Sequence, residues 1–220
     1  MTPVTPTMLA MQQAYRPVEV LPPVEITTQR LFFRPLSLAD RPAVLDAIAT
    51  SRDTLAGRIP LNHDDESDDA MFTRWVESAA ECDNNRSAWR RAAFLDDGTF
   101  IGLFNLIKIE FGLEWTCEIN WWVDRRCAGL GYASEAVDAV LRFATDEMPT
   151  GLGITRVRAM IQPDNAASIR VAEKAGMRPT GATDLLPVDG EHRTHHAYEC
   201  IPALIAHPAQ GVGVASGSAA

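Results

Sequence analysis

The chain has 220 residues, of which 46% are hydrophobic and 22% charged, and its formal net charge is −9. These values are typical of one soluble globular domain with an ample core, and the negative charge argues against nonspecific binding to nucleic acid. No apolar run is long enough to span a membrane, and no basic segment followed by an apolar block marks a secretory signal. The four cysteines lie far apart without a Cys-x-x-Cys pair, so we expect reduced thiols in a cytoplasmic protein.

The two ends of the chain differ in composition from its middle. Residues 1–22 are rich in Pro, Thr and Gln without periodicity, and residues 206–220 are mostly small. We therefore predict a flexible arm and a flexible tail around a single domain over residues 23–205.

Between these ends, hydrophobic periodicity predicts alternating strands and helices. The predicted strands cover 31–36, 89–95, 99–109, 114–123, 156–161, 177–183 and 193–201. The predicted helices cover 40–50, 67–82, 133–147 and 165–175. This order predicts an α/β (α+β mixed) fold, in which a mixed sheet carries helices on both faces.

A glycine turn follows the strand predicted over 114–123. Its core is Arg126-x-x-Gly129-x-Gly131, and a helix begins directly after it. Glycines let a ligand approach the main chain, and a helix start points unpaired N–H groups at whatever lies there. The pattern is neither a P-loop nor the dinucleotide fingerprint. It indicates an anion site that fits a pyrophosphate, with an ordinary strand-to-helix turn as the alternative.

Three ordered segments together resemble the Gcn5-related N-acetyltransferases (GNAT), in particular the branch of the bacterial ribosomal-protein alanine N-acetyltransferases. The segments are Thr28-Gln29-Arg30-Leu31-Phe32-Phe33-Arg34-Pro35, then Arg126 to Gly131, then Asn165, Ser168, Lys174, Gly176 and Met177. The resemblance covers residues 25–202. It implies the GNAT fold, a central, mostly antiparallel mixed sheet that splays between its fourth and fifth strands. It also implies an acetyl-CoA-dependent N-acetyltransferase.

The resemblance implies a binding site for acetyl-CoA. In that family the pantetheine arm lies between the splayed strands, against the backbone of the fourth, and the glycine turn holds the pyrophosphate. The implied contacts here are Trp121, Trp122, Val123, Arg126, Ala128, Gly129, Gly131, Tyr132, Ala133, Asn165, Ser168 and Lys174. Core packing is the alternative for Trp121 and Trp122, and helix capping is the alternative for Asn165.

Two residues are candidates for catalysis. Glu118 is a lone carboxylate in an otherwise apolar strand, which is costly unless the group is paired or functional. Several family members place a glutamate there as general base, and an ion-paired strand residue is the alternative. The resemblance places Ser168 beside the sulfur, where it could donate to the leaving thiolate. Many relatives carry a general-acid Tyr four residues further on, where this chain has Ala172.

The segment Asp189 to His196 resembles a late turn of the family, with Thr194 in place of an Asp. We predict no metal site, because no carboxylate or cysteine completes a ligand set with the three histidines of this segment. For His195 we favour a structural, hydrogen-bonded histidine, with a position near the acceptor as the alternative.

The predicted reaction is acetyl transfer to a primary amine, and we favour a protein or peptide N-terminus as the acceptor. The alternatives are a small amine (an amino acid, polyamine or antibiotic) and a non-catalytic acyl-CoA-binding regulatory module. The run Asp64 to Asp69 either attracts a cationic amine or forms a solvated loop or the first turn of a helix. We expect a monomer or homodimer with no nucleic-acid or membrane partner.

Overall fold

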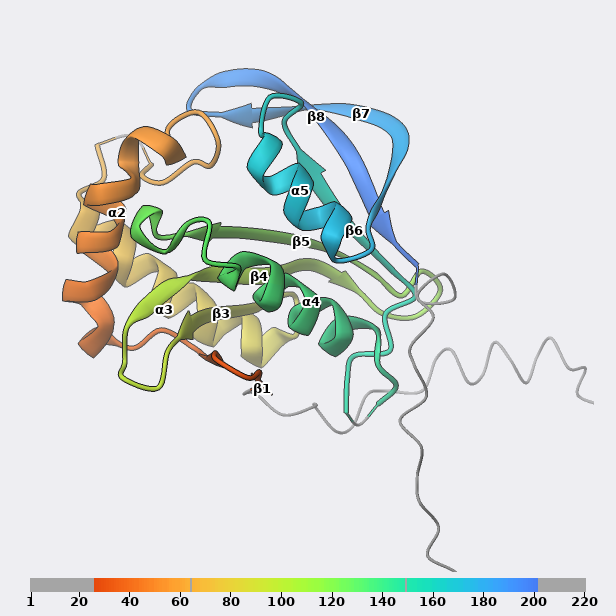
Figure 1. Ribbon diagram of the computed structural model, residues 1–220, viewed down its shortest axis with the longest axis horizontal. Coiled ribbons are helices and arrows are strands. Elements are labelled where there is room, and N and C mark those ends of the chain that lie inside the picture. The colour runs from red at the N-terminus through yellow and green to blue at the C-terminus, as the bar shows by residue number, and fades with distance from the viewer. Residues whose placement is uncertain (1–25, 64, 149, 202–220) are drawn as a thin grey trace, which may run out of the picture.

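The computed structural model describes residues 26–63, 65–148 and 150–201, so the predicted arm and tail lie outside the described residues. The described chain forms one eight-stranded sheet in the order β1-β2-β3-β4-β5-β6-β8-β7. The strands are β1 (Ile26–Thr27), β2 (Phe32–Arg34), β3 (Trp89–Phe94), β4 (Phe100–Glu110), β5 (Thr116–Val123), β6 (Arg156–Ile161), β7 (Arg178–Val188) and β8 (Glu191–Cys200) (Figure 1).

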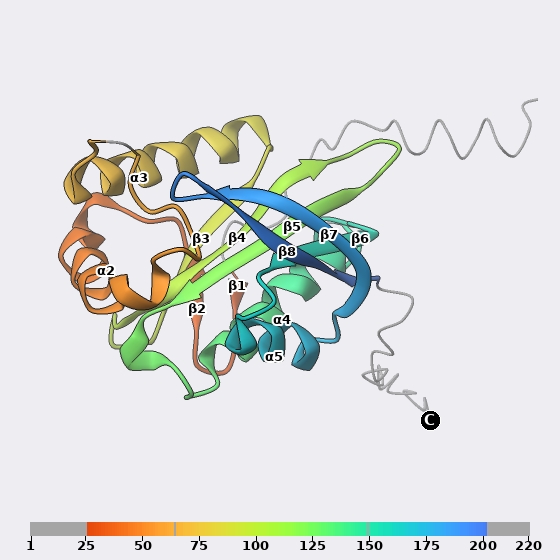
Figure 2. The same cartoon turned by 90° about the horizontal axis from the view of Figure 1, so that it is seen from above.

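Helices cover both faces of this sheet, as the sequence predicts. They are the short η1 (Leu38–Asp40) and η2 (Arg125–Cys127), and the longer α2 (Arg41–Leu55), α3 (Asp68–Asn85), α4 (Tyr132–Thr145) and α5 (Ala166–Lys174). Figure 2 shows α2 and α3 on one side of the sheet and α4 and α5 on the other. Each side has its own core. Phe104 and Val137 belong to the core on the α4 side, while Ile48 and Phe72 belong to the core on the α2 and α3 side.

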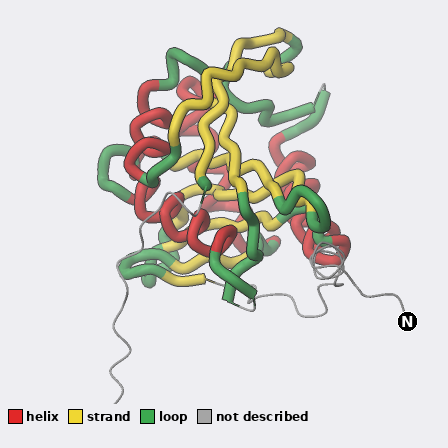
Figure 3. Tube along the Cα trace, turned by 90° about the vertical axis from the view of Figure 1, so that its right-hand side faces the viewer, coloured by secondary structure: helices red, strands yellow, loops and turns green. Residues whose placement is uncertain are grey.

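The predicted splay lies between β5 and β6, the only parallel pair in the described sheet. These strands pair only from Thr116 to Glu118 and from Arg156 to Arg158. Beyond these residues β5 continues to Val123 with β4, while β6 continues to Ile161 with β8. Figure 3 shows the strong twist of the sheet, in which one group of strands runs across the other. The divergence leaves an edge of β5 that β6 does not cover.

Several predicted boundaries were wrong for identifiable reasons. The helix predicted over 40–50 continues to Leu55, because Ser51 and Leu55 extend its buried face. The helix predicted over 133–147 ends at Thr145, where Leu152 N–H returns to the Phe143 carbonyl at 2.9 Å. Strand β7 extends to Val188 rather than 183, because its pairing with β8 continues beyond a register shift. Most of its side chains are exposed, so no hydrophobic pattern marks this extension. The two-residue β1 was not predicted.

Candidate active site

The glycine turn has the backbone geometry that the sequence predicts. Gly129 has φ 77° and Gly131 has φ 85°, a left-handed conformation that L side chains rarely adopt. A Cβ on Gly129 would meet nothing within 4 Å, so that side of the turn is open. Gly131 is the N-cap residue of α4 and offers no side chain to cap the helix. The first N–H groups of α4 are therefore available to an anion.

The first sequence motif holds this turn in place. Arg30 donates to Glu135 on α4 at 2.6 Å and to the Leu130 carbonyl at 3.1 Å. Its guanidinium also lies 4.4 Å from the centre of the Tyr132 ring. Thr28 donates to the same Glu135 carboxylate at 2.5 Å. These contacts attach the segment between β1 and β2 to the start of α4.

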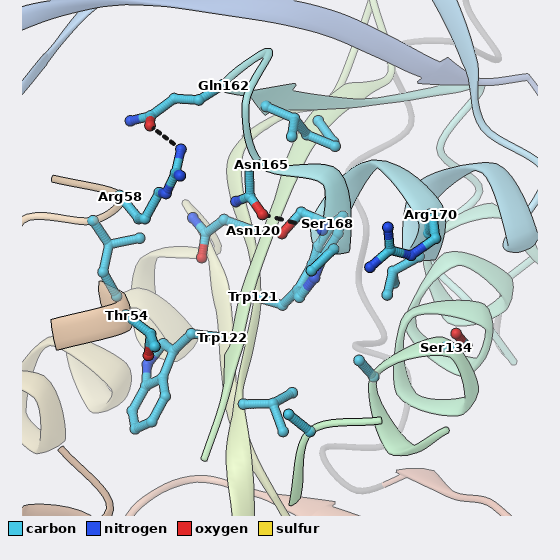
Figure 4. Close-up of a pocket in the computed structure, with 18 of the residues that line it drawn as sticks. Thr54, Arg58, Asn120, Trp121, Trp122, Ser134, Gln162, Asn165, Ser168 and Arg170 are labelled. Atoms are coloured by element: carbon cyan, nitrogen blue, oxygen red, sulfur yellow. Dashed lines mark hydrogen bonds between the residues drawn. The ribbon is translucent and has the colours of Figure 1, made fainter. Parts of the chain in front are cut away.

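A cavity of about 410 Å³ occupies the gap between β5 and β6 and extends to the glycine turn. Figure 4 shows side chains from β5, β6, α4 and α5 around it. The structure brings together here most of the residues implied as acetyl-CoA contacts, namely Trp121, Trp122, Val123, Ala128, Gly129, Gly131, Ala133, Asn165, Ser168 and Lys174. It also adds residues that sequence reasoning missed, among them Thr54, Arg58, Gln162 and Arg170.

Two of the implied contacts do not line this cavity with the rest. The Arg126 guanidinium bonds Asp124 and Asp46, each at 2.6 Å, and these carboxylates raise its pKa above the usual value. The Tyr132 ring lies beneath Arg30. Trp122 combines both interpretations made from the sequence: it packs 5.6 Å from Phe100 in the core and also borders the cavity.

Helix α5 begins at the cavity with Asn165 as its N-cap. The Asn165 Oδ1 accepts a hydrogen bond from the Ser168 N–H at 3.2 Å, which confirms the capping interpretation. The capping bond uses only the backbone of Ser168, and the residue borders the cavity. Ala172 is completely buried, so a tyrosine at this position would have to displace the core.

A second cavity, of about 530 Å³, lies on the α3 side of the sheet beneath the β7–β8 hairpin. The two cavities share one set of lining residues, namely Arg58, Ile59, Ile119, Asn120, Trp121, Trp122, Met160 and His195. They therefore meet at the open edge of β5. A ligand in the first cavity and a ligand in the second can bring reacting atoms together at this junction.

Glu118 borders the second cavity and not the first. Its Oε1 lies 3.0 Å from the Lys108 Nζ, and 23% of its side chain is exposed. The ion pair that the sequence left as an alternative is thus present. Because Lys108 is 63% exposed, water still reaches the carboxylate.

His195 is the polar residue that sequence reasoning underrated. It is only 5% exposed and lines both cavities. Its Nδ1 lies 2.9 Å from the Arg193 carbonyl oxygen. Since a carbonyl only accepts, Nδ1 carries a proton, and in the neutral imidazole Nε2 is then the acceptor. The expected hydrogen bond is present, but the residue also reaches the junction. Within the described ranges, no group of three His, Cys, Asp or Glu side chains could hold a metal ion.

The segment that follows α2 closes one side of the junction. Arg58 donates to the Gln162 Oε1 at 2.6 Å and pairs with Asp164. Gln162 returns a hydrogen bond to the Gly57 carbonyl at 2.7 Å, and the Gly57 N–H donates to Asp189 on the hairpin turn at 2.8 Å. Three remote parts of the chain therefore meet through polar contacts that no local sequence pattern signals.

Of the acidic run, Asp64 lies outside the described residues, Asp65 and Glu66 precede α3, and Asp68 and Asp69 form its first turn, as the helix-turn interpretation predicts for these two. Ser67 caps the helix by accepting from the Ala70 N–H at 3.2 Å. Arginines pair with three of the acids: Glu66 bonds Arg74 at 2.7 Å, Asp68 bonds Arg52 at 2.6 Å and Asp69 bonds Arg41 at 2.6 Å. Hydrogen bonds, first from Arg74, lower the pKa of Glu66 to about 2. These ion pairs weaken the hypothesis that the run attracts a cationic amine.

Comparison with known proteins agrees with this geometry. The family of the acetyltransferase (GNAT) domain matches residues 30–178. The uncharacterized N-acetyltransferase YnaD of Bacillus subtilis is 31% identical over 161 residues, which are 72% of this chain and 85% of that protein.

Solved structures share the fold. Mycobacterium smegmatis RimJ, solved with CoA-disulfide, superposes with a TM-score of 0.72 at 19% identity over 80% of this chain and 84% of that one. The ribosomal-protein-S5-alanine acetyltransferase of Vibrio fischeri gives 0.68 at 17% identity, over 81% and 97%. In the described part of the chain, no helix is both long and apolar enough to cross a membrane. The family match and the relative that covers most of the chain show that this protein belongs to the GNAT family of acetyltransferases.

Proposed function

We propose that the protein transfers the acetyl group of acetyl-CoA to a primary amine, and that this amine is the N-terminus of a protein or peptide. The observation that carries the proposal is the gap between β5 and β6, whose cavity runs from the glycine turn to a junction with a second cavity. The fold shared with RimJ and with the alanine acetyltransferase supports the choice of acceptor.

The acetyl-CoA half of the proposal rests on the first cavity. The pyrophosphate would lie on the N–H groups at the start of α4, beside Gly129 and Gly131, and the pantetheine arm along β5 at Trp121 to Val123. A free N–H on that strand edge would polarise the thioester carbonyl. Ser168 would hydrogen-bond the sulfur.

In the chemical step, the amine nitrogen attacks the thioester carbon and the C–S bond breaks. The electron pair leaves with sulfur as the CoA thiolate, and the amine loses one proton to a base. We assign the amine to the second cavity, which is called the acceptor cavity from here on. We propose Glu118, acting through water, as the base, because it borders this cavity and remains in contact with solvent. His195 is the competing candidate, because its Nε2 is free to accept and the residue lies at the junction.

The two most deeply buried cysteines take no part in this reaction. Burial raises the pKa of Cys117 to about 12 and that of Cys200 to about 11, so these thiols stay protonated and inert. All four are free, which supports a location in the reducing cytoplasm.

The proposal is tested by the release of CoA thiol from acetyl-CoA with defined amines. We expect turnover with short peptides that have a free N-terminus and none with the same peptides blocked at the N-terminus. Turnover with spermidine or free amino acids but not with peptides would show that the acceptor is a small amine and not a peptide N-terminus. Binding of acetyl-CoA without turnover on any amine would favour the non-catalytic alternative.

A further inference from the structure

The floor of the acceptor cavity carries a row of polar side chains. Arg90 on β3 pairs with Asn105 on β4, and Asn105 pairs with Asn120 on β5. Residues directly opposite on antiparallel strands share one face of the sheet, so these three side chains form a line across it. Asn105 Nδ2 donates to Asn120 Oδ1 at 2.9 Å. All three residues line the second cavity, and only Asn120 also lines the first.

The walls around this row are mainly apolar, so Arg90, the charged residue of the row, lies in mostly apolar surroundings. Trp75, Leu103 and Val188 are among the apolar residues that line the cavity. Three of its cations are paired with carboxylates: Arg58 with Asp164, Arg74 with Glu66, and Arg91 with Asp83. Its one carboxylate, Glu118, is paired with Lys108.

Arg90 differs from these three arginines. Its Nε is buried and has no hydrogen-bond partner among the described residues. The guanidinium bonds the Cys82 thiol: burial alone would raise the pKa of Cys82, and hydrogen bonds from Arg90, Ser87 and Ser78 lower it below the usual value. A buried donor without an acceptor is costly, and a guanidinium matches a carboxylate with two parallel hydrogen bonds.

We propose that the amine acceptor carries a carboxylate and that Arg90 binds it. The inference rests on the proposed function. The amine would lie at the Asn120 end of the row, where the cavities meet, and the carboxylate at the other end. The Cα atoms of Asn120 and Arg90 are two strand spacings apart, about 10 Å. That span suits an acidic side chain near a peptide N-terminus or a small amine with its own carboxylate, and Arg90 would act as a specificity residue for either.

The test compares each acid with its neutral amide. One pair is Ala-Glu-Ala-Ala amide and Ala-Gln-Ala-Ala amide, and the other is L-alanine and L-alaninamide. We expect the acid of at least one pair to have the higher kcat/KM by about tenfold or more, because a hydrogen bond to a charged group contributes about 1.5–3 kcal/mol. The pair that shows the preference identifies the source of the carboxylate.

Two variants assign the preference to Arg90. Arg90→Met should raise the KM of the acid, so that acid and amide have equal kcat/KM values. Arg90→Lys should keep a reduced preference, because the charge remains. Arg156→Met, which removes an exposed arginine outside both cavities, serves as the matched control, and thermal unfolding of each variant checks the fold.

Three outcomes would overturn the inference. They are equal rates for acid and amide in both pairs, an acid preference that survives in Arg90→Met, and the same loss in Arg156→Met. Good turnover of the amides with no preference for the acids would reject the proposal that Arg90 binds a carboxylate, and it would leave the acetyltransferase proposal intact. Absence of turnover with every amine would reject both.

Discussion

The two sides of the β5–β6 gap are built in different ways. The proposed donor side, which comprises residues 124–134 and the start of α5, consists of short continuous segments whose glycines and caps act locally. The acceptor side comprises residues 56–63, α3, the floor of β3 to β5 and the β7–β8 hairpin, and its parts meet only in the folded chain. A site made of local turns can be read from a sequence, whereas a site made of remote walls has no pattern of its own.

On the proposed donor side, substitution at a single backbone position should be enough to weaken acetyl-CoA binding. We expect Gly129→Val to weaken acetyl-CoA binding by about a hundredfold or more, because the side chain would enter the open side of the turn and displace several phosphate contacts. Gly98→Val is a matched control, since Gly98 also has a positive φ with nothing near its Cβ position and lies in the β3–β4 turn, outside both cavities. Calorimetry with acetyl-CoA measures both. Equal losses would mean that backbone strain, and not the ligand, explains the effect.

Loss of Glu118, the proposed base on the acceptor side, is expected to affect turnover and not the binding of acetyl-CoA. Glu118→Gln should lower kcat by about a hundredfold, as loss of a positioned base does, with acetyl-CoA affinity unchanged. His195→Gln is the comparison, because both residues border the acceptor cavity. Steady-state kinetics across the pH range distinguish them. A loss of less than about twofold in Glu118→Gln, together with a large one in His195→Gln, would move the role to His195.

Removal of a contact that joins the walls of the acceptor side should have a smaller effect. Arg58→Ala removes the bonds to Gln162 and Asp164, so the segment after α2 keeps only the Gln162 hydrogen bond to the Gly57 carbonyl as its described side-chain link to the residues that follow β6. We expect the KM of the amine to rise by no more than several-fold, because an ion pair with an exposed carboxylate contributes little. Arg52→Ala is the control, because it breaks a pair with Asp68 away from the junction. Similar KM values for these two variants would argue against a role for the link.

The last predicted effect is on stability and not on activity, and it lies outside the gap, at the start of α2. Arg34 bonds the Asp40 carboxylate at 2.6 and 2.7 Å, and the Ser37 N–H and hydroxyl bond it as well. Burial alone would raise the pKa of Asp40, but these bonds together lower it. Asp40→Asn should therefore cost about 1–2 kcal/mol of stability at neutral pH.

The sign of the pH dependence follows from the lowered pKa. The contribution of Asp40 is present above its unfolded pKa and is lost as the pH falls through its lower folded pKa. Chemical denaturation of wild type and Asp40→Asn at pH 7 and near pH 3 measures this, with a difference that shrinks in acid. A difference that grows in acid would show that Asp40 is not stabilised as the carboxylate.

The sequence alone determined the order of the main helices and strands, the glycine turn and the capped start of α5. Each of these depends on neighbouring residues, through backbone angles, hydrophobic period or a cap that closes within three positions. The ordered motifs were also sufficient to indicate the family.

Only the tertiary structure decided how the acceptor side is arranged. The pairing of Glu118 with Lys108, the position of His195 at the junction and the line from Arg90 to Asn120 depend on strand register. Register is fixed by long-range packing and by turns far along the chain, and a shift of one residue would move each of these side chains to the opposite face of the sheet. Local patterns carry no record of such pairings, which is why the sequence indicated the proposed donor side and left the acceptor side open.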